Sequence, residues 1–306
     1  MDRERFFTNK KAIVLLAGLC TLLWGSAYPC IKIGYEVFHI AQDDITSKFV
    51  FAGYRFFLAG VIVLIIAILL KKEVFVFNKK ALGQIALLGL GQTSLQYIFF
   101  YIGMTYTSGI RGSIITGSGT FFSIILAHIL YKNDKLNLNK IIGCIIGFTG
   151  VVIANLNGDS LLGNSFTLKG EGFVMLAALS LSVASIYGKE ITRKLDPFLV
   201  SGYQLSIGGI ILILLGYVFG GTLSGFTIKS ISLLMYMALL SSVAFSIWTI
   251  LLKYNKVGFI SMFNFLIPIF GSILSAIFLG ENIFDIKILI ALILVCFGIY
   301  LVYKRN

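Results

Sequence analysis

Polar side chains at helical spacing interrupt one of the long apolar stretches of this sequence, and these groups could contact a ligand. Gln92 and Gln96 are four residues apart, as are Tyr97 and Tyr101. Residues four apart lie on the same face of a helix, so the two pairs form neighbouring polar patches. Amides and phenols form hydrogen bonds, and they can hold a small polar molecule that also has an apolar part.

A second polar stripe follows later in the chain. Ser242, Ser246 and Thr249 are spaced i, i+4, i+7, and Asn264 lies one turn before Pro268. Such side chains can line a cavity, or they can hold helices together at roughly 0.6 kcal/mol each. Their collection in a few apolar stretches favours a cavity lining. The candidate substrate-binding residues are Trp24, Tyr28, Arg55, Gln92, Gln96, Tyr97, Tyr101, Thr116, Thr120, Gln204, Ser242 and Asn264.

Arg55 is the charge that lies deepest inside an apolar stretch. A charge in that position costs roughly 2.5–3.5 kcal/mol on insertion scales, so it should face protein or water. It could contact an anion or act in gating, or it could extend to the membrane surface or brace backbone carbonyls. Arg55 lies about two helical turns from the outer face of the membrane. Lys32 and Arg111 lie near that outer face and mark the membrane–water interface there. Trp24 and Tyr28 could form walls of the cavity or belong to an interfacial aromatic belt.

Groups suited to catalysis or metal binding are sparse. Neither His39 nor His128 has a Cys, Asp or Glu at ligand spacing, and the adjacent pair Asp43 and Asp44 lies in a short polar link. The four cysteines fall within or at the ends of apolar runs, which predicts buried apolar fillers. The sequence therefore predicts no catalytic residue, no metal and no cofactor. A membrane-embedded enzyme acting on lipid or glycosyl substrates is the alternative, and it would normally need such groups.

The composition requires a membrane as solvent for these residues. The chain has 306 residues, of which 58% are hydrophobic and 12% charged, whereas soluble domains carry about 25% charged residues. The formal charge of +12 comes mostly from short loops. No basic stripe with interleaved aromatics stands apart, so nucleic acid is not an expected partner.

Ten apolar stretches have lengths that suit transmembrane helices. The fourth carries Thr116 and Thr120 between glycines, Pro29 should kink the first, and Gly143 and Gly147 in the fifth form a face for close helix packing. The ten predicted spans are 12–33, 49–70, 81–104, 109–131, 141–156, 171–188, 198–220, 231–252, 257–280 and 286–303.

Lys and Arg alternate between the two sides of this arrangement. One set of tails and links holds 18 of them and the other set holds six. Cytoplasmic loops are enriched in Lys and Arg, so both termini are predicted to be cytoplasmic. Lys71, Lys72, Lys79 and Lys80 should face the cytoplasm, and the link around Asp159 should face outward.

The chain also reads as two copies of one unit. A shift of 149 positions places Gly53 on Gly202 and Gly60 on Gly209, which predicts a first unit at 1–157 and a second at 168–306. Five spans per unit is an odd number, so the second unit must be inverted relative to the first. Inverted repeats around a midplane site are a recurring design of secondary transporters.

Several motifs resemble the drug/metabolite transporter superfamily, EamA-type. They are Trp24-Gly25-Ser26 through Lys32-Ile33-Gly34, Tyr54-Arg55-Phe56-Phe57-Leu58-Ala59-Gly60, Gly143 to Gly150-Val151-Val152, and Pro268 to Gly280-Glu281. The resemblance implies an all-α membrane fold of ten helices around a central cavity, with the fifth and tenth helices outlying. Gly119 and Lys132 replace a Pro and a Glu that the first repeat would often carry, whereas Pro268 and Glu281 are kept.

The function expected from these features is secondary transport across a bacterial plasma membrane. The cargo would be a small polar organic metabolite, best matched by an amino acid or related compound, with efflux as the expected direction. No Asp or Glu lies in the middle of a predicted span, so exchange or downhill transport is expected rather than strict proton coupling. The expected partners are the small-molecule substrate and the lipid bilayer, and a homodimer is left open.

Overall fold

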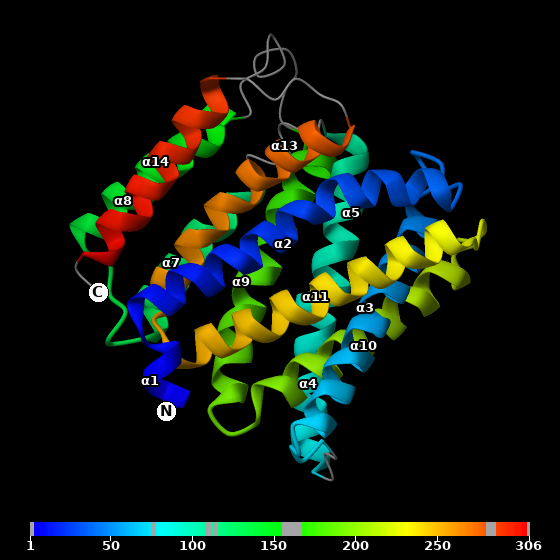
Figure 1. The fold of residues 1–306 in the computed structure, drawn as a ribbon, viewed down its shortest axis with the longest axis horizontal. Helices are drawn as coiled ribbons and strands as arrows, with labels where there is room; N and C mark the ends of the chain where they lie inside the picture. The colour runs from blue at the N-terminus through cyan, green and yellow to red at the C-terminus, as the bar shows by residue number, and fades with distance from the viewer. Residues whose placement is uncertain are drawn as a thin grey trace.

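The chain folds into a bundle of long helices (Figure 1). The computed structural model describes residues 3–74, 78–107, 112, 115–154, 167–279 and 286–304, and the regular elements in these ranges are all helical. They are α1 (Arg3–Phe7), α2 (Lys10–Val37), α3 (Ile45–Leu69), α4 (Lys79–Gly89), η1 (Leu90–Leu95), α5 (Gln96–Tyr106), α7 (Ser118–Leu130), α8 (Leu138–Ala154), η3 (Leu168–Gly172), α9 (Phe173–Thr192), α10 (Pro197–Val218), α11 (Ile228–Tyr254), α12 (Val257–Ser261), η4 (Met262–Phe265), α13 (Leu266–Leu279) and α14 (Ile286–Tyr303).

Each of the ten predicted spans corresponds to a helix or to consecutive helical segments. Seven of these units are long and apolar enough to cross a membrane, and the remaining three are shorter apolar helices. The prediction of a polytopic all-α membrane protein is therefore confirmed. Among the residues that the sequence singled out, Arg111, Asp159 and Glu281 lie outside the described ranges.

The helices extend beyond several predicted boundaries. Lys48 lies in the first turn of α3 and Lys189 in the last turn of α9, whereas Arg55 lies well inside α3. At the start of α3 the extension arises because the polar N-cap sits outside the apolar run. Asp44 accepts a hydrogen bond from the Ser47 amide at 2.9 Å and begins α3, a role for which aspartate is favoured.

The two repeats meet most extensively where α3 packs against α10. A Cβ atom at Gly53 would lie 2.8 Å from the Gly209 carbonyl oxygen, and one at Gly60 would lie 2.5 Å from the Gly202 oxygen. The shift of 149 positions converts the first of these contacts into the second. Reciprocal contacts between antiparallel helices are what a two-fold relation between inverted repeats produces.

Helices α8 and α14 form a separate pair at one edge of the bundle (Figure 1). A Cβ at Gly143 would lie 2.7 Å from the Gly298 oxygen, and one at Gly147 would lie 2.8 Å from the Phe265 ring. The predicted glycine face is thus used for close packing. The fifth and tenth helices are outlying, as the resemblance implied.

Irregular turns interrupt two of the membrane-crossing segments. The π-helical turn η1 contains Gln92, and the 3₁₀ turn η4 contains Asn264. Such turns alter which side chains point into the bundle, and they occur often at functional sites. Pro29, where a kink was expected, lies inside a helix that continues to Val37.

The links after Leu69, Leu130, Thr192 and Tyr254 gather at one end of the bundle, together with the N-terminal helix α1. Lys72 is hydrogen-bonded to Asp196, and the Asn255 side-chain amide donates to the Phe7 oxygen at 2.9 Å. We call this the inner end, after the predicted cytoplasmic orientation, and the opposite one the outer end.

Candidate substrate-binding site

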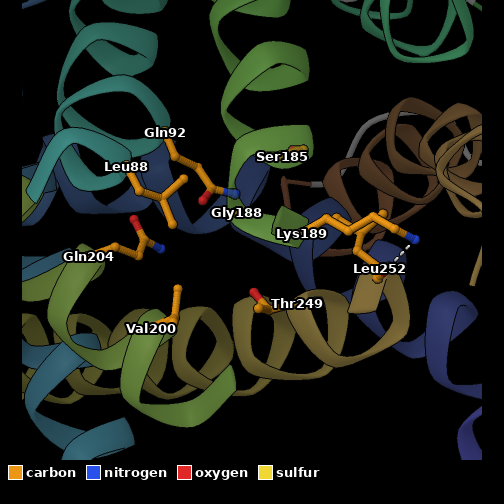
Figure 2. A pocket seen from close by; sticks show the side chains of 9 residues that line it. All are labelled: Leu88, Gln92, Ser185, Gly188, Lys189, Val200, Gln204, Thr249 and Leu252. Atoms are coloured by element: carbon orange, nitrogen blue, oxygen red, sulfur yellow. Dashed lines mark hydrogen bonds between the residues drawn. The ribbon is translucent and has the colours of Figure 1, made fainter. Parts of the chain in front are cut away.

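A small cavity lies between the two repeats, toward the inner end (Figure 2). Gln92 and Gln204 point toward each other across it. The cavity volume is about 10 Å³, roughly the space for one water molecule, so the path is closed at this level. The lining residues are Leu88, Gln92, Ser185, Gly188, Lys189, Val200, Gln204, Thr249 and Leu252.

Side-chain hydrogen bonds join the helices that form the walls of the cavity. The Thr93 hydroxyl donates to Gln204 Oε1 at 2.8 Å, which joins the first repeat to the second. The Ser201 hydroxyl donates to Thr249 Oγ1 at 3.0 Å, which joins α10 to α11. Gln92 and Gln204 are almost fully buried, at 6% and 1% exposure. Buried amides in a bundle need such partners because an unpaired polar group costs about 1–3 kcal/mol.

Two buried polar atoms, each one turn from a residue that lines this cavity, have no protein partner within the described ranges. They are Gln96 Oε1 and Ser246 Oγ. Gln96 lies one turn beyond Gln92 toward the outer end, and Ser246 lies one turn before Thr249 on α11. Polar positions therefore continue along both helices from the cavity lining toward the outer end, and we call Gln92, Gln96, Gln204 and Ser246 the polar column. The unused hydrogen-bonding capacity of Gln96 and Ser246 suits a polar ligand or water.

Arg55 lies in the outer half of the bundle and is 1% exposed. Its Nε donates to the Ser241 hydroxyl oxygen at 2.9 Å, and its Cζ lies 4.9 Å from the centroid of the Phe56 ring. The buried side chain thus does not extend to the membrane surface, and within the described ranges its hydrogen bond goes to a hydroxyl rather than to a backbone carbonyl. Its role in binding stays a prediction.

A connected set of aromatic rings, which we call the ring wall, joins α2, α3, α5 and α11. Trp24 contacts Phe245 and Trp248, with ring centroids 5.4 and 5.1 Å apart. Tyr97 lies 4.5 Å from Phe56 and 5.9 Å from Tyr101. Tyr28 and Tyr97 lie deep in the bundle yet keep part of their surface accessible. Partial access at that depth suits side chains that face a recess rather than lipid.

The remaining predicted residues make the contacts of helix packing. The Thr116 hydroxyl donates to the Gly112 oxygen at 2.7 Å, and the Thr120 hydroxyl donates to the Ser261 oxygen at 3.3 Å. The Ser242 hydroxyl lies 3.0 Å from the Ala59 oxygen, which links α11 to α3. Asn264 is half-buried in its 3₁₀ turn. For these four residues a part in binding also stays a prediction.

Sequence reasoning missed Thr93, Ser185, Lys189, Ser201 and Ser241, which complete the cavity and the Arg55 contact. The internal repeat held a usable signal for two of them. The shift of 149 relates Arg55 to Gln204, Gln92 to Ser241 and Thr93 to Ser242. A search for polar residues at both members of each repeat pair would have found Ser241 and Thr93.

The inner end is closed by side chains that join the two repeats. The Tyr131 hydroxyl donates to Glu190 Oε1 at 2.6 Å, and Arg193 lies 2.9 Å from the same carboxylate. The Gly258 amide donates to Asp134 Oδ2 at 2.9 Å, and Asp134 forms a buried ion pair with Lys140. We call these five residues and the Gly258 amide the inner-end network.

Lys189 connects this network to the cavity. Its Nζ donates to the Leu252 oxygen at 2.7 Å and also to the Asn255 oxygen. These carbonyls belong to the C-terminal end of α11, where a positive charge is favoured by the helix dipole. Its contacts therefore fix α9 to the end of α11 directly below the cavity.

Comparison with known proteins agrees with this architecture. The EamA-like transporter family matches residues 11–156 and 168–304. The chain belongs to this family, whose members include transporters of bacteria and archaea.

Individual relatives are distant but cover most of the chain. An uncharacterized transporter of Bacillus subtilis, YoaV, is 24% identical over 287 residues, which span 92% of this chain and 93% of that protein. An uncharacterized transporter of Archaeoglobus fulgidus is 25% identical, spanning 97% and 99%. A chloroplastic WAT1-related protein of Arabidopsis thaliana is 25% identical, spanning 91% and 66%.

A solved crystal structure shares the fold. It matches with a TM-score of 0.77 and 15% identity, covering 96% of this chain and 97% of that one. The multi-pass architecture and the family together define a membrane transporter.

Proposed function

We propose that this protein is a secondary transporter that moves a small polar organic metabolite across the plasma membrane by alternating access. The observation that carries the proposal is the polar column between the two inverted repeats. It contains Gln92, Gln96, Gln204 and Ser246, and two of these present buried atoms without a protein partner.

Alternating access would follow from separation of the inner-end network. In this conformation the network joins α7 and its following link to α9 and α12, and the cavity beneath the column has room for about one water molecule. Opening it would admit water to Gln92 and Gln204 from the inner side. The two-fold relation between the repeats supplies a matching motion at the outer end.

The cargo that best fits the lining is an amino acid or a related compound. Amide and hydroxyl groups from Gln92, Gln96 and Ser246 would hydrogen-bond its polar part, while Trp24 and Tyr97 would pack against its apolar part. Efflux is the direction we expect.

The energy source we expect is exchange or a downhill gradient. A buried carboxylate is the usual proton relay in carriers. Among the described residues, Glu171 and Glu190 are the helical carboxylates of the second repeat, and both lie near helix ends. An imposed pH gradient alone should therefore not drive accumulation.

Flux in proteoliposomes tests the proposal. A panel of amino acids, amines, nucleosides and sugar phosphates would be measured with wild type, Gln96→Leu and Asn264→Leu. We expect flux of an amino acid or related compound that falls at least tenfold in both variants. Gln42→Leu, the same kind of change in an exposed link, should transport like wild type.

Two results would contradict the proposal. One is wild-type flux in both Gln96→Leu and Asn264→Leu, which would remove the polar column and the η4 turn from the transport path. The other is strong uphill uptake under a proton gradient alone, which would require a relay that this mechanism lacks.

A further inference from the structure

Arg55 has hydrogen-bonding capacity that the protein does not use. A guanidinium group carries five N–H donors. Within the described ranges, Nε is the nitrogen that forms a hydrogen bond, to Ser241. The Ser241 hydroxyl in turn donates to the Met237 oxygen at 2.8 Å. The hydroxyl therefore uses its proton within α11 and accepts from Arg55. The terminal nitrogens of Arg55 are left for another acceptor.

Within the described ranges, no carboxylate forms an ion pair with Arg55. Lys72–Asp196, Lys140–Asp134 and Arg193–Glu190 are ion pairs that lie toward the inner end, away from Arg55. The groups that lie within reach of the Arg55 charge are the phenols of Tyr35, Tyr97 and Tyr101 and the thiol of Cys30. A buried cation without a counter-ion is strongly unfavourable unless an anion can join it.

The scaffold itself does not need a cation at this position. The repeat counterpart of Arg55 is Gln204, a neutral residue that is equally buried and accepts a hydrogen bond from Thr93 at 2.8 Å. An amide is therefore sufficient to join the facing helices at this point of the fold. Of the two counterparts, only Arg55 in the outer half carries a positive charge, and the helix packing does not require that charge.

From these observations we propose that Arg55 binds the carboxylate of the transported metabolite. This inference rests on the proposed transport function and narrows its cargo to small molecules with a carboxylate. The terminal nitrogens of Arg55 would donate to the two carboxylate oxygens, which is the bidentate geometry that arginine favours. The Tyr97 and Tyr101 hydroxyls would lie beside the same group, and the ring wall would pack against the apolar part of the substrate.

A small inorganic anion could also accept hydrogen bonds from Arg55, so the experiment must distinguish such an anion from the carboxylate of a substrate. Proteoliposomes with wild type, Arg55→Gln and Arg55→Lys would be assayed with L-amino acids and, for each, the corresponding carboxamide. The panel would also contain neutral nucleosides and quaternary amines. Arg5→Gln removes an exposed arginine outside the bundle and serves as the matched control.

We expect wild type to transport a carboxylate compound at least tenfold better than its carboxamide. Arg55→Gln should lose this discrimination, Arg55→Lys should keep part of it, and Arg5→Gln should behave as wild type. If a variant loses all flux, thermal unfolding in detergent shows whether it is folded and whether it still binds the carboxylate compound. Arg55→Gln should remain folded, and the carboxylate compound should raise the melting temperature of wild type but not of this variant.

Other outcomes overturn the inference in distinguishable ways. Equal transport of the carboxylate and the carboxamide by wild type would show that Arg55 does not select the cargo. If chloride in place of gluconate then raised the melting temperature only when Arg55 is present, the anion would be inorganic. Transport of only neutral or cationic compounds would refute the carboxylate but leave the transporter intact. No flux with any compound would refute the transport proposal and this inference together.

Discussion

The outer and inner halves of this transporter differ at one repeat position, which carries a charged residue in the outer half and a neutral one in the inner half. In the outer half, Arg55 of α3 contacts Ser241 of α11, whereas in the inner half Gln204 of α10 contacts Thr93 of η1. Arg55 and Gln204 occupy the same position of the two repeats. The inner contact is satisfied within the protein, and the outer one leaves donors free. Both repeats thus keep a buried polar residue at this position, and the first repeat carries a charge there.

At the glycine contacts, in contrast, the two repeats carry the same residue. Gly60 and Gly209 are also repeat counterparts, and each lies against the backbone of the facing helix. Close packing of α3 on α10 needs a small residue at both places, so neither copy could diverge. The comparison separates positions that close packing keeps the same in both repeats from a position where the two repeats differ in charge.

The assignment of inner and outer halves gives the largest expected effect, since labelling is all or none. In a cysteine-free background, a cysteine at Lys229 should react with an impermeant thiol reagent in intact cells. A cysteine at Lys79 should react only after permeabilisation. Both positions are exposed. The reverse pattern would exchange the two halves and place Arg55 on the cytoplasmic side.

A cation introduced into the inner contact should strongly destabilise the protein. In Gln204→Arg the Thr93 hydroxyl loses its acceptor, and a second cation enters the cavity that Lys189 already lines. We expect a loss of about 2.5–3.5 kcal/mol, the cost of a charge placed inside a membrane helix, seen as a lower melting temperature in detergent. Arg55→Gln should not lose stability. Equal stability of Gln204→Arg and wild type would show that the two halves tolerate charge alike.

Gly60→Ala and Gly209→Ala should each lower the stability of the protein by less than Gln204→Arg does, and by the same amount in both repeats. A Cβ at Gly60 would lie 2.5 Å from the Gly202 oxygen, and one at Gly209 would lie 2.8 Å from the Gly53 oxygen. Overpacking of this kind costs roughly 1–3 kcal/mol. Gly18→Ala is the control, because no atom lies within 4 Å of the added methyl group. A stable Gly60→Ala variant would refute the close packing of α3 on α10.

The sequence was sufficient to predict the fold because the membrane imposes simple rules on it. Apolar runs of the right length predicted the ten spans, and the 149-residue shift predicted two copies of one unit, which the reciprocal contacts of Gly53 and Gly60 reflect. Helix ends were less predictable, since caps such as Asp44 lie outside the apolar runs. Lys189 likewise lies beyond the predicted end of its span, in the last turn of α9.

The site was predictable only in part because residue type does not reveal the direction of a side chain. Gln92 and Gln204 could be chosen as polar residues in apolar runs, but their approach across one cavity depends on the turn η1. Thr116 and Thr120 looked equally suitable, yet their hydroxyls donate to backbone oxygens. The inner-end network joins residues far apart in the chain, so no local pattern indicated it.

Locking the inner-end network is the most direct test of alternating access between the repeats. Tyr131 and Glu190 would be replaced by cysteines in the cysteine-free background and joined by a short reducible cross-linker, since their side chains are in contact. Flux of the substrate identified in proteoliposomes should fall to background after cross-linking and return after reduction. Either single cysteine treated in the same way should keep its flux. Undiminished flux through the cross-linked protein would contradict the account, because the substrate would then cross without separation of the repeats at this end.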